Sequence, residues 1–367
     1  MAIRWHSLLL VIALSLFALT DAQSNSTNSS TSTNSTNVST NTSSTSIPAG
    51  TNCTLTRMRK SWDDYNTSEK NLYIAAVTKA IALGYQQKFV ELHTEYFSEL
   101  EAHQTCVFIY WHRMFLLGYE NMLRSLAPEY ACLTLPVWDH LTLSGLYSTN
   151  KCTGLQSCSP IMKDLGGYST GYYKNSVVYN VTIPYSTSRT YGQLCINQGP
   201  LYQYCFNATS CGHCVMRGNV NNVYPTAALY TSVYTQMFSS NNSASFTQLV
   251  ERGVHSEFDL SFSHHLLLLN LCIFWPDTVH SAISGTMAYF QSPLDPIFFS
   301  HHSFIDALQT VYLKCQNGAE GVLLTDAQKS SDTRFWSSCS RRNKGIFNAN
   351  DTITMKVLAN DNKTWAN

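Results

Sequence analysis

Three histidines within twenty residues constrain the fold of this chain more than any other feature of its sequence: His93, His103 and His112. His93 falls in a stretch with helical spacing of apolar residues, and the apolar face of residues 112–126 predicts a second helix that begins at His112. The segment between His103 and His112 is predicted to be extended. Neutral imidazoles from two helices and a loop can converge on one metal ion. The pattern therefore indicates a metal site, and a histidine satisfied in the core or on the surface is the alternative for each residue.

Helical spacing of apolar residues dominates the chain outside its middle. Between residues 66 and 100 two helical stretches are predicted, the first of which ends at Gly84, and further helices are predicted at residues 112–126, 226–238, 245–253 and 302–313. Residues 150–215 are instead rich in Tyr, Ser, Gly and Asn and contain six cysteines, which outside the cell predicts an irregular region pinned by disulfides. Cys211 and Cys214 could instead hold a metal ion. We therefore expect one mainly helical domain with a long irregular insertion.

The first 50 residues are predicted to precede the folded domain. Residues 1–22 combine Arg4, an apolar core and a small-residue cleavage site, which is typical of a secretory signal peptide. Residues 23–50 are rich in Ser, Thr and Asn and are predicted to be disordered and glycosylated. Residues 51–367 would then form the domain of a secreted, extracellular glycoprotein. The net charge of zero favours neither nucleic acid nor an anionic membrane as a partner, and the oligomeric state is left open.

Two longer motifs flank the irregular region, and each combines histidine with aromatic and acidic residues at fixed spacing. The first motif consists of His103, residues 108–113, Leu116 and Glu120. The second consists of residues 295–299, His302 and Asp306. The first resembles the copper A signature of the tyrosinase family, and the second resembles its copper B signature. Residues 135–139 resemble the Leu-Pro-Tyr-Trp-Asp segment of the family, with Val137 in place of the Tyr. This resemblance spans roughly residues 53–315. It implies a four-helix bundle core that holds two copper ions, each bound by three histidines.

The resemblance also assigns ligands residue by residue. The copper A ligands would be His93, His103 and His112. Copper B would be bound by His302 and by a pair of histidines spaced four residues apart on one helix, of which His280 matches the second. His301 is the neighbour that the signature does not assign to the metal. Three charged residues of the signatures are interpreted as groups that staple the bundle together: Arg113, Glu120 and Asp306.

The first copper B histidine is missing from its expected place, because Pro276 stands four residues before His280. Removing residues 256–276 joins His255 to Asp277 and restores His-x-x-x-His, a spacing that puts both imidazoles on one face of a helix. The residues at both ends of this peptide can also be encoded by codons that contain donor-like and acceptor-like splice sites, as in a retained intron. We therefore predict that residues 256–276 are an unspliced intron or an error in the gene model, and that His255 completes the copper B set. Splicing would turn residue 277 into Asn.

Two other interpretations of residues 256–276 stay open. In the first, the insertion is genuine and His264 or His265 supplies the missing copper B ligand. In the second, the chain is a glycoprotein that has lost copper B and its activity. A transmembrane helix is disfavoured, because Asp259 and the two histidines interrupt an apolar run that is already short.

The resemblance implies a binuclear copper oxidase that uses dioxygen to convert monophenols, o-diphenols or both to o-quinones. Its partners would be a small phenol and dioxygen. Glu251 resembles a family Glu that, together with an Asn expected at the position of Asp277, holds the water that accepts the phenol proton. The alternative for Glu251 is a solvated charge at a helix end. A non-enzymatic copper protein that binds dioxygen is the main functional alternative.

Overall fold

The computed structural model describes residues 53–167, 195–207, 210–211, 213–240, 242–256, 278–316 and 339–340. The chain divides into two compact units, Met1–Ser46 and Ile47–Asn367, and every described residue belongs to the second. The expected signal peptide at 1–22, the segment at 23–50, all but the first residue of 256–276, and Asp277 therefore lie outside the described residues.

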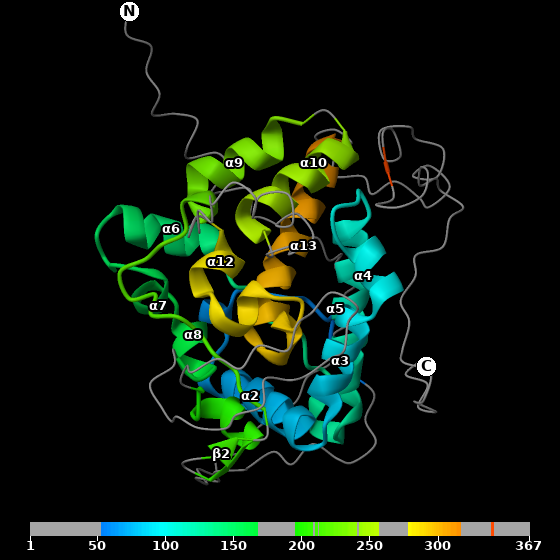
Figure 1. Cartoon of the computed structure of the whole chain (residues 1–367), viewed down its shortest axis with the longest axis vertical. Coiled ribbons are helices and arrows are strands. Elements are labelled where there is room, and N and C mark those ends of the chain that lie inside the picture. Colours follow the sequence, from blue (N-terminus) through cyan, green and yellow to red (C-terminus); the bar gives the residue numbers. More distant parts are fainter. Residues whose placement is uncertain are drawn as a thin grey trace, which may run out of the picture. The chain divides into compact units, whose positions relative to one another are not determined.

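Helices make up most of the regular structure in this part of the chain, and Figure 1 shows their arrangement. The α-helices are α2 (Thr67–Ala82), α3 (Tyr85–Thr94), α4 (Tyr96–Ala102), α5 (Phe108–Ser125), α6 (His140–Ser148), α7 (Leu155–Cys158), α8 (Pro160–Asp164), α9 (Tyr230–Phe238), α10 (Ser243–Val250), α12 (Val279–Ile283) and α13 (Ile297–Gln316). Shorter 3-10 turns are η1 (Trp62–Asp64), η2 (Pro128–Tyr130), η3 (Gly199–Tyr204), η4 (Thr226–Ala228), η7 (Gly285–Ala288) and η8 (Ser292–Leu294). A π-helical turn, η5 (Glu251–His255), follows α10. Two short strands, β1 (Cys205–Asn207) and β2 (Ser210–Cys211), pair in antiparallel fashion. The expectation of a mainly helical fold is confirmed.

The local sequence explains where α2 begins and ends. The Asn66 side chain accepts the amide of Glu69, and the Glu69 carboxylate accepts the amide of Asn66, which forms a capping box. Gly84 follows the last turn of α2 with φ of 77°, a left-handed conformation that glycine adopts without steric cost. The chain therefore turns at Gly84, as the sequence predicts, and α3 begins directly after it.

α5 begins at Phe108, one turn earlier than the His112 start that the sequence predicted, so the segment before His112 is not extended. The additional turn is stabilised by burial, because Phe108, Ile109 and Trp111 are all inaccessible to solvent. It also places the Phe108 carbonyl beneath the His112 ring, where it lies 2.8 Å from Nδ1. The extra turn thus both fills the core and orients a candidate ligand.

α5 and α13 are far apart in the sequence but lie side by side in the core (Figure 1). Phe115 of α5 stacks on Phe299 of α13, with ring centroids 5.7 Å apart. Phe89 of α3 meets Phe115 edge-on at 5.4 Å and Phe299 at 6.0 Å. Aromatic pairs of this kind contribute about 0.5–1.5 kcal/mol beyond the burial of their area. The three helices therefore form one packed unit.

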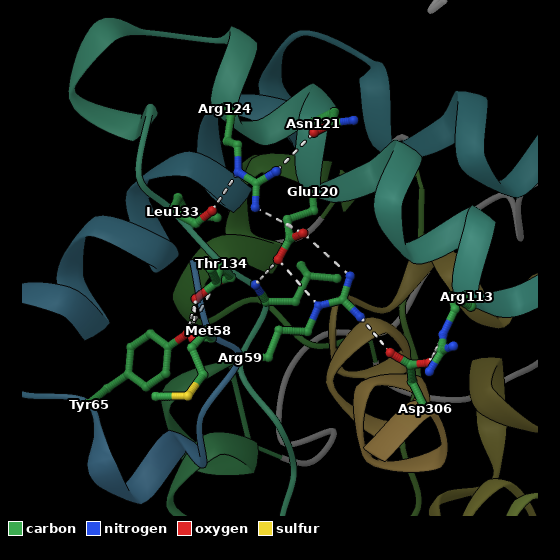
Figure 2. A network of polar contacts seen from close by, with 11 residues as sticks. Met58, Arg59, Tyr65, Arg113, Glu120, Asn121, Arg124, Leu133, Thr134 and Asp306 are labelled. Atoms are coloured by element: carbon green, nitrogen blue, oxygen red, sulfur yellow. Dashed lines mark hydrogen bonds and ion pairs between the residues drawn. The ribbon is translucent and has the colours of Figure 1, made fainter. Parts of the chain in front are cut away.

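Charged residues staple the same helices together (Figure 2). Glu120 of α5 accepts hydrogen bonds from Arg59 at 3.3 Å and from the Leu135 amide at 2.8 Å. Arg59 also donates to Asp306 of α13 at 3.0 Å, and Asp306 accepts from Arg113 of α5. The segment before α2 and the two central helices are thus joined by one network. The structural role expected for Arg113, Glu120 and Asp306 is confirmed.

Four disulfides join eight of the described cysteines: Cys53–Cys132, Cys106–Cys339, Cys152–Cys158 and Cys195–Cys214. Two of them pin the irregular region at 150–215, as expected from its composition. Because the Cys214 sulfur is bonded to Cys195, the alternative in which Cys211 and Cys214 hold a metal ion is wrong. Among the described helices, none is long and apolar enough to cross a lipid bilayer.

Candidate metal centre

The structure brings the three histidines of the expected copper A set together. His93 lies on α3, His103 is the C-cap of α4, and His112 lies on the second turn of α5. All three are buried, and one ring nitrogen from each lies within 4.8 Å of the others. A cluster of imidazole nitrogens with these separations matches the size of a single metal site.

Backbone carbonyls orient two of these rings. His93 Nδ1 lies 2.9 Å from the Phe290 oxygen, and His112 Nδ1 lies 2.8 Å from the Phe108 oxygen. Because a carbonyl can only accept, each Nδ1 carries the proton and each Nε2 presents a lone pair. The two Nε2 atoms are 3.4 Å apart. Two imidazole nitrogens that bind one tetrahedral ion at about 2.0 Å would be about 3.3 Å apart.

The copper B set also assembles. His255 ends η5, His280 lies on α12 and His302 lies on α13, and one ring nitrogen from each lies within 4.8 Å of the others. The Met287 carbonyl accepts from His280 Nδ1 at 2.5 Å. Both ring nitrogens of His255 and His302 are buried with no hydrogen-bond partner among the described residues. An unsatisfied buried polar group costs about 1–3 kcal/mol. A bound metal ion would satisfy these nitrogens, so the residues fit a metal.

The two histidine sets are direct neighbours. The rings of His112 and His302 stack with centroids 4.3 Å apart and planes 14° apart, and the rings of His103 and His255 are 6.4 Å apart. Burial, and after it the neighbouring imidazoles, hold the pKa of His112, His255 and His302 well below the usual value for histidine. These rings are therefore neutral at physiological pH, and their lone pairs are available to a metal ion.

His255 reaches the other copper B histidines even though the insert separates it from them in the sequence. The rings of His255 and His280 are 4.6 Å apart, and the Thr278 hydroxyl donates to the Ser256 carbonyl at 3.2 Å. The expectation that the intact chain lacks a copper B ligand is therefore wrong. The two flanks of the insert meet in space, so the two histidines do not need to share one continuous helix.

Glu251 is not a solvated charge at a helix end, because it is only 8% exposed and its Oε1 accepts the Gln104 amide at 2.5 Å. Gln104 directly follows His103, so the carboxylate contacts the copper A loop, while η5 itself ends in His255. The sequence motif indicates Glu251 as a residue near the site, but no local pattern marks Gln104 as its partner. Asp277, the other residue expected to hold the water, lies outside the described residues.

Two further histidines lie behind the copper B set. His140 Nε2 and His301 Nδ1 are 3.1 Å apart, and the His301 ring lies 5.2 Å from the His280 ring. Burial lowers the pKa of His140 to about 3, so this ring is neutral as well. His140 is not among the histidines that the sequence motifs predict for the site. The available signal was its place directly after residues 135–139, which match a family segment.

Aromatic rings enclose the histidines. The Phe298 ring lies 4.1 Å from the His302 ring, and the Phe108 ring lies 4.6 Å from the His255 ring. Both phenylalanines are fully buried. The space around the ligand nitrogens is thus apolar, and an apolar surrounding excludes water and strengthens electrostatic interactions within the site. Two adjacent metal ions in such a site can act together on one small ligand.

Comparisons with known proteins identify the family. Residues 83–314, more than half of the chain, match the tyrosinase family in its common central domain. A tyrosinase from Streptomyces antibioticus is 26% identical over 262 residues, which cover 68% of this chain and 81% of the relative. A tyrosinase from Streptomyces lincolnensis is 27% identical over 267 residues, covering 68% of this chain and 80% of the relative.

A solved structure agrees at the level of the fold. A mutant polyphenol oxidase from Thermothelomyces thermophila superposes with a TM-score of 0.52 over 82% of each chain, at 19% sequence identity. Together with the family match and the two histidine sets, this likeness leads to one conclusion. The chain belongs to the tyrosinase family of type 3 copper oxidoreductases.

Proposed function

We propose that this chain is a secreted phenol oxidase that binds two copper ions, one at each histidine set. It uses dioxygen to convert monophenols, o-diphenols or both to o-quinones. The observation that carries the proposal is the pair of buried three-histidine sets that meet at the stacked rings of His112 and His302. The curated relatives named tyrosinase support the reaction class.

Copper at these positions would supply dioxygen binding and the electron transfers that phenol oxidation requires. The residues of the chain hold the ligands in place for that chemistry. The carbonyls of Phe290, Phe108 and Met287 keep a proton on Nδ1 of three ligand histidines, which directs each Nε2 toward the metal position. The buried rings of Phe108 and Phe298 lie against His255 and His302 and keep water away from these two ligands.

The experiment that tests this function measures copper and oxidation on the same samples. We expect the purified, copper-loaded chain to contain two copper ions and to convert catechol to its o-quinone with uptake of dioxygen. The His302→Ala variant should bind about one copper ion and lose oxidation by at least a hundredfold, because one set loses a ligand. A His213→Ala variant is the matched control, since His213 lies outside both sets, and it should keep both properties.

The same measurements separate the alternatives. A chain that binds dioxygen reversibly at two copper ions but forms no quinone from catechol is an oxygen-binding protein rather than an oxidase. A wild-type chain that holds one copper ion or none would contradict the proposal and favour a glycoprotein that has lost copper B. Activity on a monophenol such as tyrosine, compared with catechol, decides whether the hydroxylation step is present.

Secretion is supported by the amino-terminal pattern and by the disulfides, since stable disulfides form in oxidising compartments. Expression in a cell that exports proteins should deliver the chain to the medium with residues 1–22 removed. Amino-terminal sequencing of the secreted protein should therefore begin near Gln23. A chain retained in the cytosol with its first residues intact would contradict this part of the proposal.

A further inference from the structure

We propose that Glu251 is a positioning residue that couples the two histidine sets by holding the backbone amide of Gln104. Glu251 Oε1 lies 2.5 Å from the Gln104 nitrogen. The donor directly follows His103 of the copper A set, and the acceptor lies four residues before His255 of the copper B set. The copper-binding consequences of this contact rest on the proposed function, whereas the contact itself does not.

The donor, Gln104, has an unfavourable backbone conformation that requires a stabilising contact. Gln104 adopts a left-handed conformation with φ of 57°, which is unfavourable for a residue with a side chain. His103, directly before it, has an extended backbone with φ of −127° and ψ of 150°. The chain therefore turns sharply at the residue that follows the ligand. A hydrogen bond to the Gln104 amide contributes about 0.5–1.5 kcal/mol to holding this backbone conformation. Glu251 thus stabilises the turn that aims His103.

The acceptor side is anchored independently. Gly253 interrupts the helical backbone of η5 with φ of −91° and ψ of −110°. The Gln236 side chain of α9 accepts the Val254 amide at 2.9 Å and donates to the Ala227 carbonyl at 2.9 Å. A Cβ at position 253 would lie well under 3.0 Å from Gln236 Oε1, so glycine is required for this contact. The π-helical turn η5 is therefore fixed to α9 directly before His255. Glu251, at the start of the same turn, is held in place with it.

The position of His103 at a helix end makes it the copper A ligand that this turn controls most directly. His112 lies inside α5, where regular helical hydrogen bonds fix the backbone on both sides of the ligand, and His93 lies in the last turn of α3, within the helix itself. His103 is instead the C-cap of α4, and its amide donates to the Glu99 carbonyl at 3.2 Å. The helix supports His103 only from its amino-terminal side. The Gln104 turn, which Glu251 holds, supplies the support on the other side.

The positioning role differs from that of a proton acceptor in what it demands of the side chain. Positioning needs an oxygen at the right reach and no charge, whereas a base needs a carboxylate. Three variants separate the two demands. Glu251→Gln keeps the reach and an acceptor oxygen but removes the charge. Glu251→Asp keeps the charge but is shorter by one methylene, and Glu251→Ala loses both.

The first readout is amide hydrogen exchange at Gln104 in the full-length, copper-free protein. We expect exchange at least tenfold faster than wild type in Glu251→Asp and Glu251→Ala, and within twofold of wild type in Glu251→Gln. The matched control is Glu129→Ala, an exposed glutamate on η2, which should leave exchange at Gln104 unchanged. If Glu251→Ala does not fold, the Gln and Asp variants still decide the outcome.

The second readout is the copper content of the loaded protein. We expect Glu251→Gln to keep two copper ions and Glu251→Asp to fall toward one copper ion. The proposal is overturned if Gln104 in the Asp variant exchanges as in wild type, or if the Gln variant loses copper while the Asp variant keeps it. A wild-type chain that binds no copper would contradict only the proposed function. The hydrogen-exchange result would still decide whether Glu251 positions Gln104.

Discussion

Burial penalises charged side chains in this protein, and buried ionisable residues avoid that penalty either by staying neutral or by pairing with an opposite charge. Some histidines stay neutral, as His140 does with His301 as its partner. Asp295 instead stays paired with Arg217, whose Nε and Nη2 each lie 2.7 Å from a carboxylate oxygen, with neither side chain exposed. The guanidinium also donates to the Leu165 carbonyl at 3.1 Å. The neutral histidine and the buried ion pair each predict a measurable effect on the stability of the fold.

The neutral His140 predicts a pH dependence of stability. Its pKa is about 3 in the folded chain and about 6.5 in an unfolded one, so between these values only the unfolded state binds the proton. Stability is therefore fully present above about pH 6.5 and is lost as the pH falls toward 3, at up to about 1.4 kcal/mol per pH unit. Urea unfolding of wild type and His140→Gln from pH 7 to pH 4 checks this. The two curves of unfolding free energy against pH should converge on acidification, and parallel curves would contradict the prediction.

The Asp295–Arg217 pair predicts a large loss of stability when one partner is removed. Asp295→Asn leaves a buried guanidinium without its counter-charge, which costs about 3–5 kcal/mol in comparable cases. We expect a clear fall in thermal midpoint and in urea resistance. The control is Asp64→Asn, which changes the same chemical group at an exposed position. Equal stability of the two variants would show that the pair contributes little.

At the scale of elements, two helices differ from their sequence patterns at the site. α5 gains a turn before His112, and η5 continues past the predicted helix end at Gly253 to His255, with a break in its helical backbone at Gly253. In both cases a specific contact accounts for the departure: the Phe108 carbonyl meets the His112 ring, and Gln236 takes the Val254 amide. The elements that carry ligands are thus shaped by the partners that orient those ligands.

The break in η5 predicts that Gly253→Ala is harmful. The added Cβ would lie well under 3.0 Å from Gln236 Oε1, and overpacking of this kind costs about 1–3 kcal/mol. Because His255 lies two residues further on, we also expect copper content to fall toward one ion per chain. Gly145→Ala on α6 is the matched control, since nothing lies within 4 Å of its added Cβ. It should be neutral or stabilise the chain by up to about 1 kcal/mol, and a neutral Gly253→Ala would contradict the expected clash.

At the scale of the whole molecule, the site depends on contacts between distant segments. Cys106, in the loop between His103 and α5, is bonded to Cys339 across a sequence separation of 233 residues. Arg59 joins α5 to α13 from a segment that precedes all the described helices. The flanks of the insert meet at Ser256 and Thr278. Each contact holds the ligand-bearing segments in one arrangement.

The meeting of those flanks predicts that residues 256–276 are dispensable. A chain that lacks them should fold, bind two copper ions and oxidise catechol at least as fast as the full chain. The reason is that His255 and His280 already lie with their rings 4.6 Å apart, and the deletion places both on one helix face. Sequencing of the mature transcript should show that the segment is spliced out. A main transcript that retains it, or a deleted chain that loses copper B, would contradict this prediction.

Short-range spacing in the sequence by itself determined the helical character of the chain and the grouping of His93, His103 and His112, while the resemblance of the two motifs to a known family implied the copper ligands, His280 and His302 among them, and the stapling residues. Such features are encoded within one turn or one motif, so they can be read locally. Only the tertiary structure decided how His255 joins the copper B set, that Glu251 holds the Gln104 amide, and that His140 pairs with His301. These contacts join segments that are distant in the sequence. Many of them also use backbone carbonyls and amides, which every part of the chain carries and no residue pattern marks.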